Sequence, residues 1–186
     1  MKILEQIAVY LRERKWQYIL DEEHQCIMTG VASENLQKLI IIIKLSEDGE
    51  YFEITIPELF TGLKTYPHQN MVFKTMLAIA SETKMLRWEY KTTTDAVNAK
   101  IEFPLEDAQL TQKQFERCLD SLVQLVDEIA IPRLLQVMET GEDPGDIKLG
   151  ERLLLTLSEI LPEGSLNLLE QALKARKLRG KIVGEN

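Results

Sequence analysis

The chain has 186 residues, of which 45% are hydrophobic and 28% are charged, and its formal net charge is −8. This composition is typical of a folded globular protein, and it excludes fibrous, low-complexity and disordered classes. Single domains cluster near roughly 100–150 residues, so the length accommodates one domain and an appendage.

The charge is unevenly distributed along the chain. Residues 1–140 carry −7, residues 141–170 carry −5, and residues 171–186 carry +4. An acidic body repels phosphate backbones, so nucleic acid is disfavoured as the principal ligand.

Two features of the sequence bear on location. The longest apolar run, residues 39–43, is far shorter than the ~20 residues that a membrane helix requires, and the N-terminus has no signal-peptide pattern. The two cysteines, Cys26 and Cys118, lie far apart in apolar stretches, which is typical of a reducing compartment. We therefore expect a soluble cytoplasmic protein without a membrane span.

The first quarter of the chain predicts a helix followed by strands. Residues 3–14 have apolar side chains at three- and four-residue spacing, as in an amphipathic helix. Residues 16–31 predict a strand with a polar interruption at 21–24. Residues 36–45 contain four consecutive isoleucines, which favour a strand, and an apolar run without alternation is typical of a central strand covered on both faces.

A hairpin is the strongest local prediction. Asp48-Gly49 supplies the positive φ angles of a tight turn, and residues 51–56 alternate cleanly after it. Pro57 has no N–H to donate, so the strand should end there. Residues 58–69 then predict a loop.

The rest of the body predicts a helix, a second hairpin and a long helix. Residues 70–84 have a helical apolar pattern, and residues 87–93 and 99–105 alternate as paired strands. Thr111 and Gln114 have capping-box spacing, so a helix should begin there. Pro132 should either kink this helix or end it and start another turn. The body, residues 1–140, is thus α+β, with the order α-β-β-β-α-β-β-α and an antiparallel sheet.

The composition of the sequence changes after the body. Residues 141–147 are rich in glycine, proline and acidic residues and predict a linker. Residues 148–186 predict a helical hairpin that is lined by leucines and has a basic C-terminus. Such a hairpin cannot bury its leucines alone. It must dock on the body, on a second copy or on a partner.

Few residues could carry chemistry. His24 and Cys26 are the only close pair of metal-ligand types, and without a second pair at zinc spacing we favour a turn histidine and a core cysteine. Glu102, Glu106 and Asp107 could serve a small enzyme as paired carboxylates, although a solvated surface explains them better. With no phosphate-binding loop or nucleophile motif, we expect no catalytic residue, no cofactor and no metal.

Apolar and basic residues are the better candidates for binding. Trp88 and Tyr90 share a strand face, where core packing is the default and partner anchoring the alternative. If helices cover one face of the sheet only, the other face needs a dimer mate, the tail or a client. The candidate partner-binding residues are Ile41, Ile43, Phe52, Trp88, Tyr90, Leu153 and Leu157.

The last segment holds the only basic cluster. It consists of Lys174, Arg176, Lys177, Arg179 and Lys181. Cations near a helix C-terminus complement its dipole, which we favour over a site for RNA, a membrane surface or an acidic partner.

The element order of the body resembles the type III secretion chaperone fold, which also occurs in the YbjN-like proteins, described as sensory transduction regulators. The resemblance rests on the hairpin at 40–56, the second hairpin at 87–105 and the ending from Leu110 through Asp127 to Leu134. It implies a homodimer that binds an extended or partly folded polypeptide client along apolar surface, without catalysis. Residues 146–180 are not part of that pattern. The function we expect is therefore a non-catalytic, chaperone-like or regulatory protein-binding module.

Overall fold

The computed structural model describes residues 3–183, with side chains described up to Arg176. Two compact units divide between Asp143 and Pro144, inside the segment that the sequence assigns to a linker. No helix among the described residues is long and apolar enough to cross a membrane.

The body contains a six-stranded sheet in the order β1-β2-β3-β4-β6-β5, in which every neighbouring pair is antiparallel. The strands are β1 (Tyr18–Asp21), β2 (Cys26–Ala32), β3 (Lys38–Ser46), β4 (Tyr51–Thr61), β5 (Arg87–Lys91) and β6 (Ala96–Pro104). The α+β class and the antiparallel sheet are confirmed. The sheet has one strand more than the expected order, because the polar interruption in residues 16–31 is the turn between β1 and β2.

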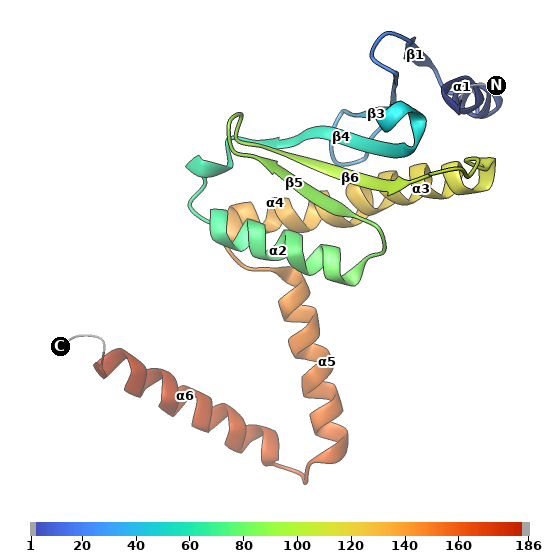
Figure 1. Cartoon of the computed structure of the whole chain (residues 1–186). Helices are drawn as coiled ribbons and strands as arrows, with labels where there is room; N and C mark the ends of the chain where they lie inside the picture. Colours follow the sequence, from blue (N-terminus) through green and yellow to red (C-terminus); the bar gives the residue numbers. More distant parts are fainter. Residues whose placement is uncertain (1–2, 184–186) are drawn as a thin grey trace. The chain divides into compact units, whose positions relative to one another are not determined.

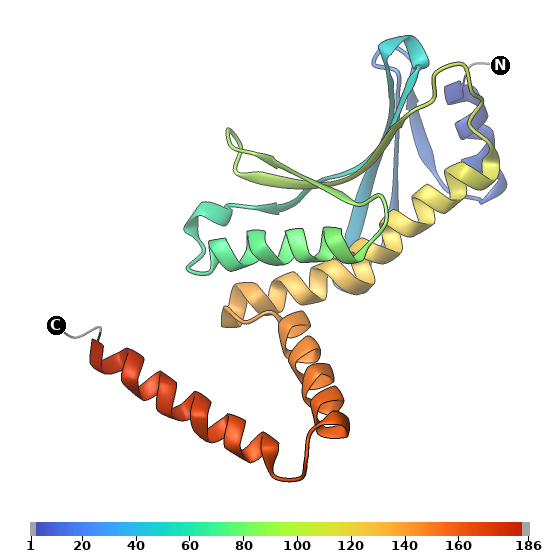
Figure 2. The same ribbon diagram turned by 60° about the horizontal axis from the view of Figure 1, so that its bottom comes forward.

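Four helices belong to the body, namely α1 (Ile3–Glu13), α2 (Gln69–Glu82), α3 (Gln112–Gln124) and α4 (Ile131–Thr140). Figures 1 and 2 show α2, α3 and α4 along one face of the sheet. The ring centroid of Phe115 on α3 lies 5.9 Å from that of Tyr10 on α1 and 6.5 Å from that of Phe52 on β4. Helix α1 therefore packs on that face too. All four helices therefore cover the same side.

Burial along β3 follows from this one-sided cover. Leu39, Ile41 and Ile43 are at most 1% exposed, whereas Ile40, on the other face, is 47% exposed. The expectation of a strand covered on both faces is wrong, and the alternative of helices on one face only is the one observed. The sequence could not show this, because a run of identical apolar residues conceals the two-residue period of its strand.

The β3–β4 hairpin is confirmed, with Asp48 at φ 56° and Gly49 at φ 98° in its turn. The expected strand end at Pro57 is wrong, since β4 continues to Thr61. Its register with β6 shifts between Ile56 and Phe60, and this irregularity accommodates the proline. Within it, the Glu58 N–H donates to Asn98 Oδ1 at 2.9 Å.

The capping box that starts α3 is confirmed: the Thr111 side chain and the Gln114 side chain each accept from the other's backbone N–H. Pro132 does not end the helical path. A π-helical segment, Leu125–Ala130, joins α3 to α4, and the Ile131 N–H donates to Val126 O. A π-turn inside a helix adds a residue and redirects the chain, which here brings Asp127 to face the β2–β3 loop.

Asp127 holds that loop. It is 6% exposed, and its carboxylate accepts from Ser33 Oγ at 2.5 Å and from the Glu34 N–H at 2.9 Å. Asn35 Nδ2 donates to the Asp127 backbone oxygen at 2.6 Å. Burial raises the pKa of the Asp127 carboxyl, hydrogen bonds from the loop lower it, and the net pKa lies below the ordinary value of 3.8.

The second unit consists of α5 (Pro144–Ile160) and α6 (Ser165–Val183). The two expected helices are present, although α5 begins at Pro144, inside the segment expected to be a linker. Figures 1 and 2 show the two helices diverging from the turn that joins them.

The hydrogen bonds between Asp127 and the β2–β3 loop, which we call the loop clamp, predict a stability that depends on pH. Because the native pKa of Asp127 is depressed, its contribution is complete above the unfolded pKa and is lost as pH falls through the native value. We expect Asp127→Ala to lower the free energy of unfolding by about 3 kcal/mol at pH 7, because Ser33 Oγ and the Glu34 N–H lose a charged acceptor. The effect should be smaller at pH 3. Urea unfolding at both pH values measures it.

Asp120→Ala is the matched control. Asp120 pairs with Arg14 on the surface and is 56% exposed, so its loss should cost less than about 1 kcal/mol. Equal losses for the two variants, or a loss at Asp127 that does not change with pH, would contradict the clamp.

Candidate functional site

The face of the sheet without helices is the first candidate surface. One row of side chains crosses all six strands on this face, because directly paired residues point the same way. The row consists of Ile19, Met28, Ile42, Thr55, Lys100 and Arg87. It is apolar over β1, β2 and β3 and charged over β6 and β5. We call this side of the sheet the open face.

The apolar half of the open face is exposed. Ile19 is 67% exposed, Met28 45% and Ile40 47%, while Ile42 is half-buried. Lone exposed apolar residues are normal, but these four lie on three adjacent strands and form one patch. We call Ile19, Met28, Ile40 and Ile42 the apolar quartet.

The charged half of the open face is a closed ion-pair network. Lys100 Nζ lies 3.1 Å from Glu53, 3.0 Å from Glu89 and 3.5 Å from Glu102, and Arg87 pairs with Glu102. The hydrogen bond from Lys100 is the main reason that the pKa of Glu89 is lowered. Two cations therefore pair with three carboxylates, and none of Glu53, Glu89 and Glu102 lacks a partner.

A shallow hollow lies next to the quartet, where β3 and β4 part. Their register runs from Ile42–Thr55 to Ser46–Tyr51, so Lys38 to Ile41 of β3 pair with β2 alone. The hollow has a volume of about 280 Å³ and is lined by Leu36, Lys38, Leu39, Ile40, Ile56, Pro57, Glu58 and Leu59. It extends the apolar surface of the quartet along β3.

The sheet residues that the sequence nominates for binding lie elsewhere. Ile41, Ile43 and Phe52 are fully buried beneath the helices, so the chain itself covers them. Their neighbours Ile40 and Ile42, one residue out of phase, face outwards. The sequence identifies a strand that carries exposed apolar residues but not which of its sides is exposed, because nothing in four isoleucines distinguishes the two sides.

The nominated residues of the second unit are exposed. Leu153 is 55% and Leu157 37% exposed, and no described residue of α5 is buried. The other large exposed apolar side chains of this unit are Ile147, Leu149, Leu154, Leu155, Ile160, Leu168, Leu169 and Leu173. The apolar surface of α5 and α6 is therefore a second candidate surface.

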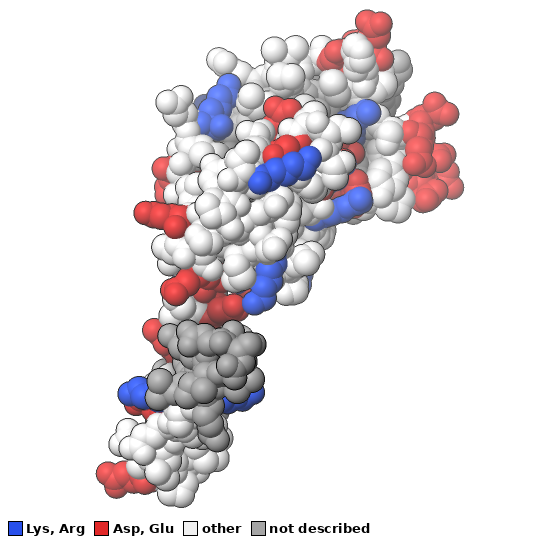
Figure 3. Space-filling model, turned by 90° about the vertical axis from the view of Figure 1, so that its left-hand side faces the viewer, with Lys and Arg blue, Asp and Glu red and all other residues white. Residues whose placement is uncertain are grey.

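The basic cluster is only partly described. Lys174 pairs with Glu170 one turn earlier at 2.6 Å, and Arg176 is exposed. The side chains of Lys177, Arg179 and Lys181 lie outside the described residues. On the side of the molecule that Figure 3 presents, Lys and Arg side chains are separated by uncharged and acidic ones and do not gather into one patch.

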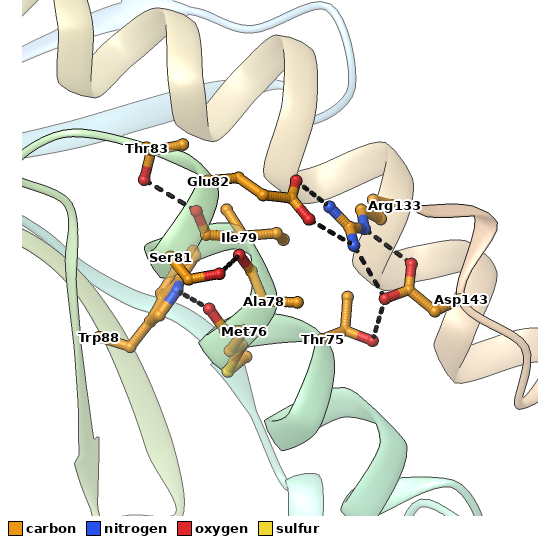
Figure 4. Close-up of polar contacts among 10 residues, drawn as sticks. All are labelled: Thr75, Met76, Ala78, Ile79, Ser81, Glu82, Thr83, Trp88, Arg133 and Asp143. Atoms are coloured by element: carbon orange, nitrogen blue, oxygen red, sulfur yellow. Dashed lines mark hydrogen bonds and ion pairs between the residues drawn. The ribbon is translucent and has the colours of Figure 1, made fainter. Parts of the chain in front are cut away.

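Trp88 and Tyr90 anchor β5 to the chain's own helix α2. Trp88 Nε1 donates to the Met76 carbonyl oxygen at 2.8 Å (Figure 4), and the Tyr90 ring lies 5.0 Å from that of Phe73. Both side chains are half-buried. Of the two alternatives for Trp88 and Tyr90, the structure therefore shows packing against the chain's own helix.

Arg133 ties α4, α2 and the end of the body together (Figure 4). Its guanidinium donates to Asp143 from Nε at 2.7 Å and from Nη2 at 2.9 Å, and to Glu82 from Nη1 at 2.7 Å. Thr75 Oγ1 donates to Asp143 at 3.1 Å. The side chain of Asp143 is 4% exposed, and its hydrogen bond is the main reason that the pKa of Arg133 is raised.

The other nominated residues do not converge on a site. Glu102 is held by Arg87 and Lys100, whereas Glu106 and Asp107 are exposed in the turn after β6, and none of the three lines the hollow beside the quartet. His24 pairs with Asp21 at 2.8 Å in an exposed turn, and Cys26 is a free thiol. Among the described residues, no group of three or more histidine, cysteine or acidic side chains could hold a metal.

Comparison with solved structures reveals a similar fold. A crystal structure of YbjN from E. coli, described as "a putative transcription regulator", matches with a TM-score of 0.52. The match covers 72% of this chain and 92% of the YbjN chain, at 7% sequence identity. The chain has a YbjN-like fold. The expected resemblance is thereby confirmed at the level of the fold, and at this identity it carries nothing further.

Sequence comparisons add no relative. No protein-family model matches the chain, and no curated protein matches it.

The Arg133 network predicts a large stability effect at one residue. We expect Arg133→Ala to lower the free energy of unfolding by about 3–5 kcal/mol, because it leaves the carboxylate of Asp143 buried without its counter-charge. Urea unfolding measures the change. Arg14→Ala, which breaks a surface pair with Asp120, should cost less than about 1 kcal/mol. Equal urea midpoints for the two variants would show that Arg133 does not hold α2, α4 and Asp143 together.

Proposed function

We propose that this protein is a non-catalytic protein-binding module, chaperone-like or regulatory, that binds a polypeptide partner through the leucine-lined helix α5. The fold is compatible with a regulatory role, since the YbjN structure of similar fold is described as that of "a putative transcription regulator". Fold alone is a weak warrant, because one fold serves many functions. The proposal therefore rests on the surface of α5.

The exposure of α5 carries the proposal. Leu149, Leu153, Leu157 and Ile160 follow one another at spacings of four and three residues and form a stripe along the helix, and each is at least 37% exposed. Residues at this spacing lie on one helix face. In water such a stripe leaves much of its apolar surface solvated, whereas in a groove each leucine stabilises the complex by roughly 1.5–3 kcal/mol when fully buried. An amphipathic helix is a common ligand for an apolar groove.

The partner is expected to be a protein rather than a nucleic acid. Asp146, Glu151 and Glu159 outnumber Lys148 and Arg152 on α5, so the helix does not attract phosphate. Free Cys26 and Cys118 support work in the reducing cytoplasm.

Substitution on the stripe tests the proposal. The protein is coupled to a resin through a tag, and a polypeptide retained from extract is purified and titrated against variants. We expect Leu153→Asp/Leu157→Asp to weaken its binding at least about hundredfold, since two charges enter the apolar contact.

Leu155→Asp/Ser158→Asp is the matched control. Both positions are exposed on the same helix, and neither lies three or four residues from a member of the stripe. The added charge is therefore the same, and binding should change by less than about threefold. Circular dichroism checks that the helical content of the two variants is equal. Equal binding by both variants would exclude the stripe as the contact.

A further inference from the structure

We infer that the apolar half of the open face binds a second copy of this chain, face to face, about a two-fold axis that runs along β2. This surface is separate from the α5 stripe, so the inference goes beyond the proposed function and stands or falls without it.

The quartet has the character of an interface centre. Ile19, Met28 and Ile40 are between 45% and 67% exposed and lie on adjacent strands. The network around Lys100 borders them on one side. An apolar centre with a polar rim is the usual anatomy of a protein interface.

Charge favours a second copy as the occupant. The strands place on the open face Lys38, Lys44, Arg87, Lys91 and Lys100, together with Asp21, Glu53, Glu89 and Glu102. These charges nearly cancel, although residues 1–140 as a whole carry −7. Two acidic chains repel each other over most of their surfaces but not over this one. A strongly charged partner would gain little here.

The sheet register selects the direction of the axis. Ile19, Met28 and Ile42 share one row, and Asp21, Cys26 and Lys44 share the next. An axis along β2 places β1 of each copy over β3 of the other. Ile19 then faces Ile42 of the second copy, and Met28 faces its own counterpart.

The same axis also pairs opposite charges. Asp21 faces Lys44 of the second copy, and the pair occurs twice. The hydrogen bond from the His24 backbone N–H is the main reason that the pKa of Asp21 is lowered, which keeps its carboxylate charged. An axis across the strands would instead set Lys100 and Arg87 against themselves. Two sheets packed with their strands nearly aligned are a common arrangement.

Ile19→Asp tests the location of the interface in the full-length protein. Ile19 is 67% exposed, so the substitution leaves the core intact, but it would bury a charge between two copies. We expect a wild-type dimer in sedimentation velocity, with a dissociation constant that rises at least about hundredfold in the variant. Leu77→Asp is the control, since Leu77 is 71% exposed on α2, on the opposite side of the sheet. It should leave the dimer unchanged.

A charge swap tests the axis. Lys44→Asp alone sets two acidic side chains against each other at both symmetric positions, and we expect the dissociation constant to rise about tenfold. Combining Lys44→Asp with Asp21→Lys restores the opposite charges, so the double variant should regain most of the lost affinity. Thermal unfolding of each variant at low concentration checks that the monomer is intact.

Three results would overturn the inference. The first is a wild-type chain that remains monomeric at high micromolar concentration. The second is a dimer that withstands Ile19→Asp. The third is a dimer that Leu153→Asp/Leu157→Asp dissociates and Ile19→Asp does not, which would place the contact between copies on α5. Loss of client binding in the α5 variants alone would concern only the proposed function. The dimer on the open face is measured separately, by sedimentation.

Discussion

The one-sided cover of the sheet is the constraint on which the rest of this structure depends. A sheet stabilises a domain by burying at least one face, and here α1 to α4 all pack on the same one. The side chains of the opposite face are therefore exposed to water. On β4, β6 and β5 these side chains form the Lys100 network of paired charges, which is compatible with solvent. On β1, β2 and β3 they are the apolar quartet, which is not.

The body presents that face as a preformed surface. Asp127 fixes the β2–β3 loop next to the quartet, Trp88 fixes β5 to α2, and Arg133 fixes α2 to α4. The hydrogen bonds of Asp127 and Trp88 are half-buried, and the side chain of Arg133 is 11% exposed. A surface held in this way loses little conformational entropy on binding, which favours affinity.

Much of the fold could be predicted from local chemistry. The Asp48-Gly49 turn, the capping box at Thr111 and the helical spacing in residues 3–14 all form as their sequence requires. The count of strands could not be predicted as well, because the polar turn after Asp21 could equally interrupt one strand. The path at Pro132 depends on a π-helical segment in which Asp127 bonds to a loop 93 residues earlier in the chain, and local sequence does not reveal such a contact.

The candidate surfaces were only partly predictable. The leucines of α5 were expected to need a surface outside the hairpin, because two helices cannot bury them alone, and no described residue of α5 is buried. The sequence assigned the sheet surface to Ile41 and Ile43. These two side chains are buried, and their neighbours Ile40 and Ile42 face outwards. Which phase of a strand faces the core is decided by the helices that pack on it, and the strand alone does not contain that information.

Methionine oxidation tests most directly the central claim that a second copy of the chain covers the open face. Met28 is 45% exposed in the centre of the quartet, and Met85, before β5, is 50% exposed. Peroxide should oxidise both at similar rates in dilute protein, since exposure governs thioether oxidation. Mass spectrometry on concentrated, purified protein should then find Met28 protected and Met85 unchanged. Equal oxidation of the two methionines at every concentration would contradict the account, because it would show that no second copy covers the open face.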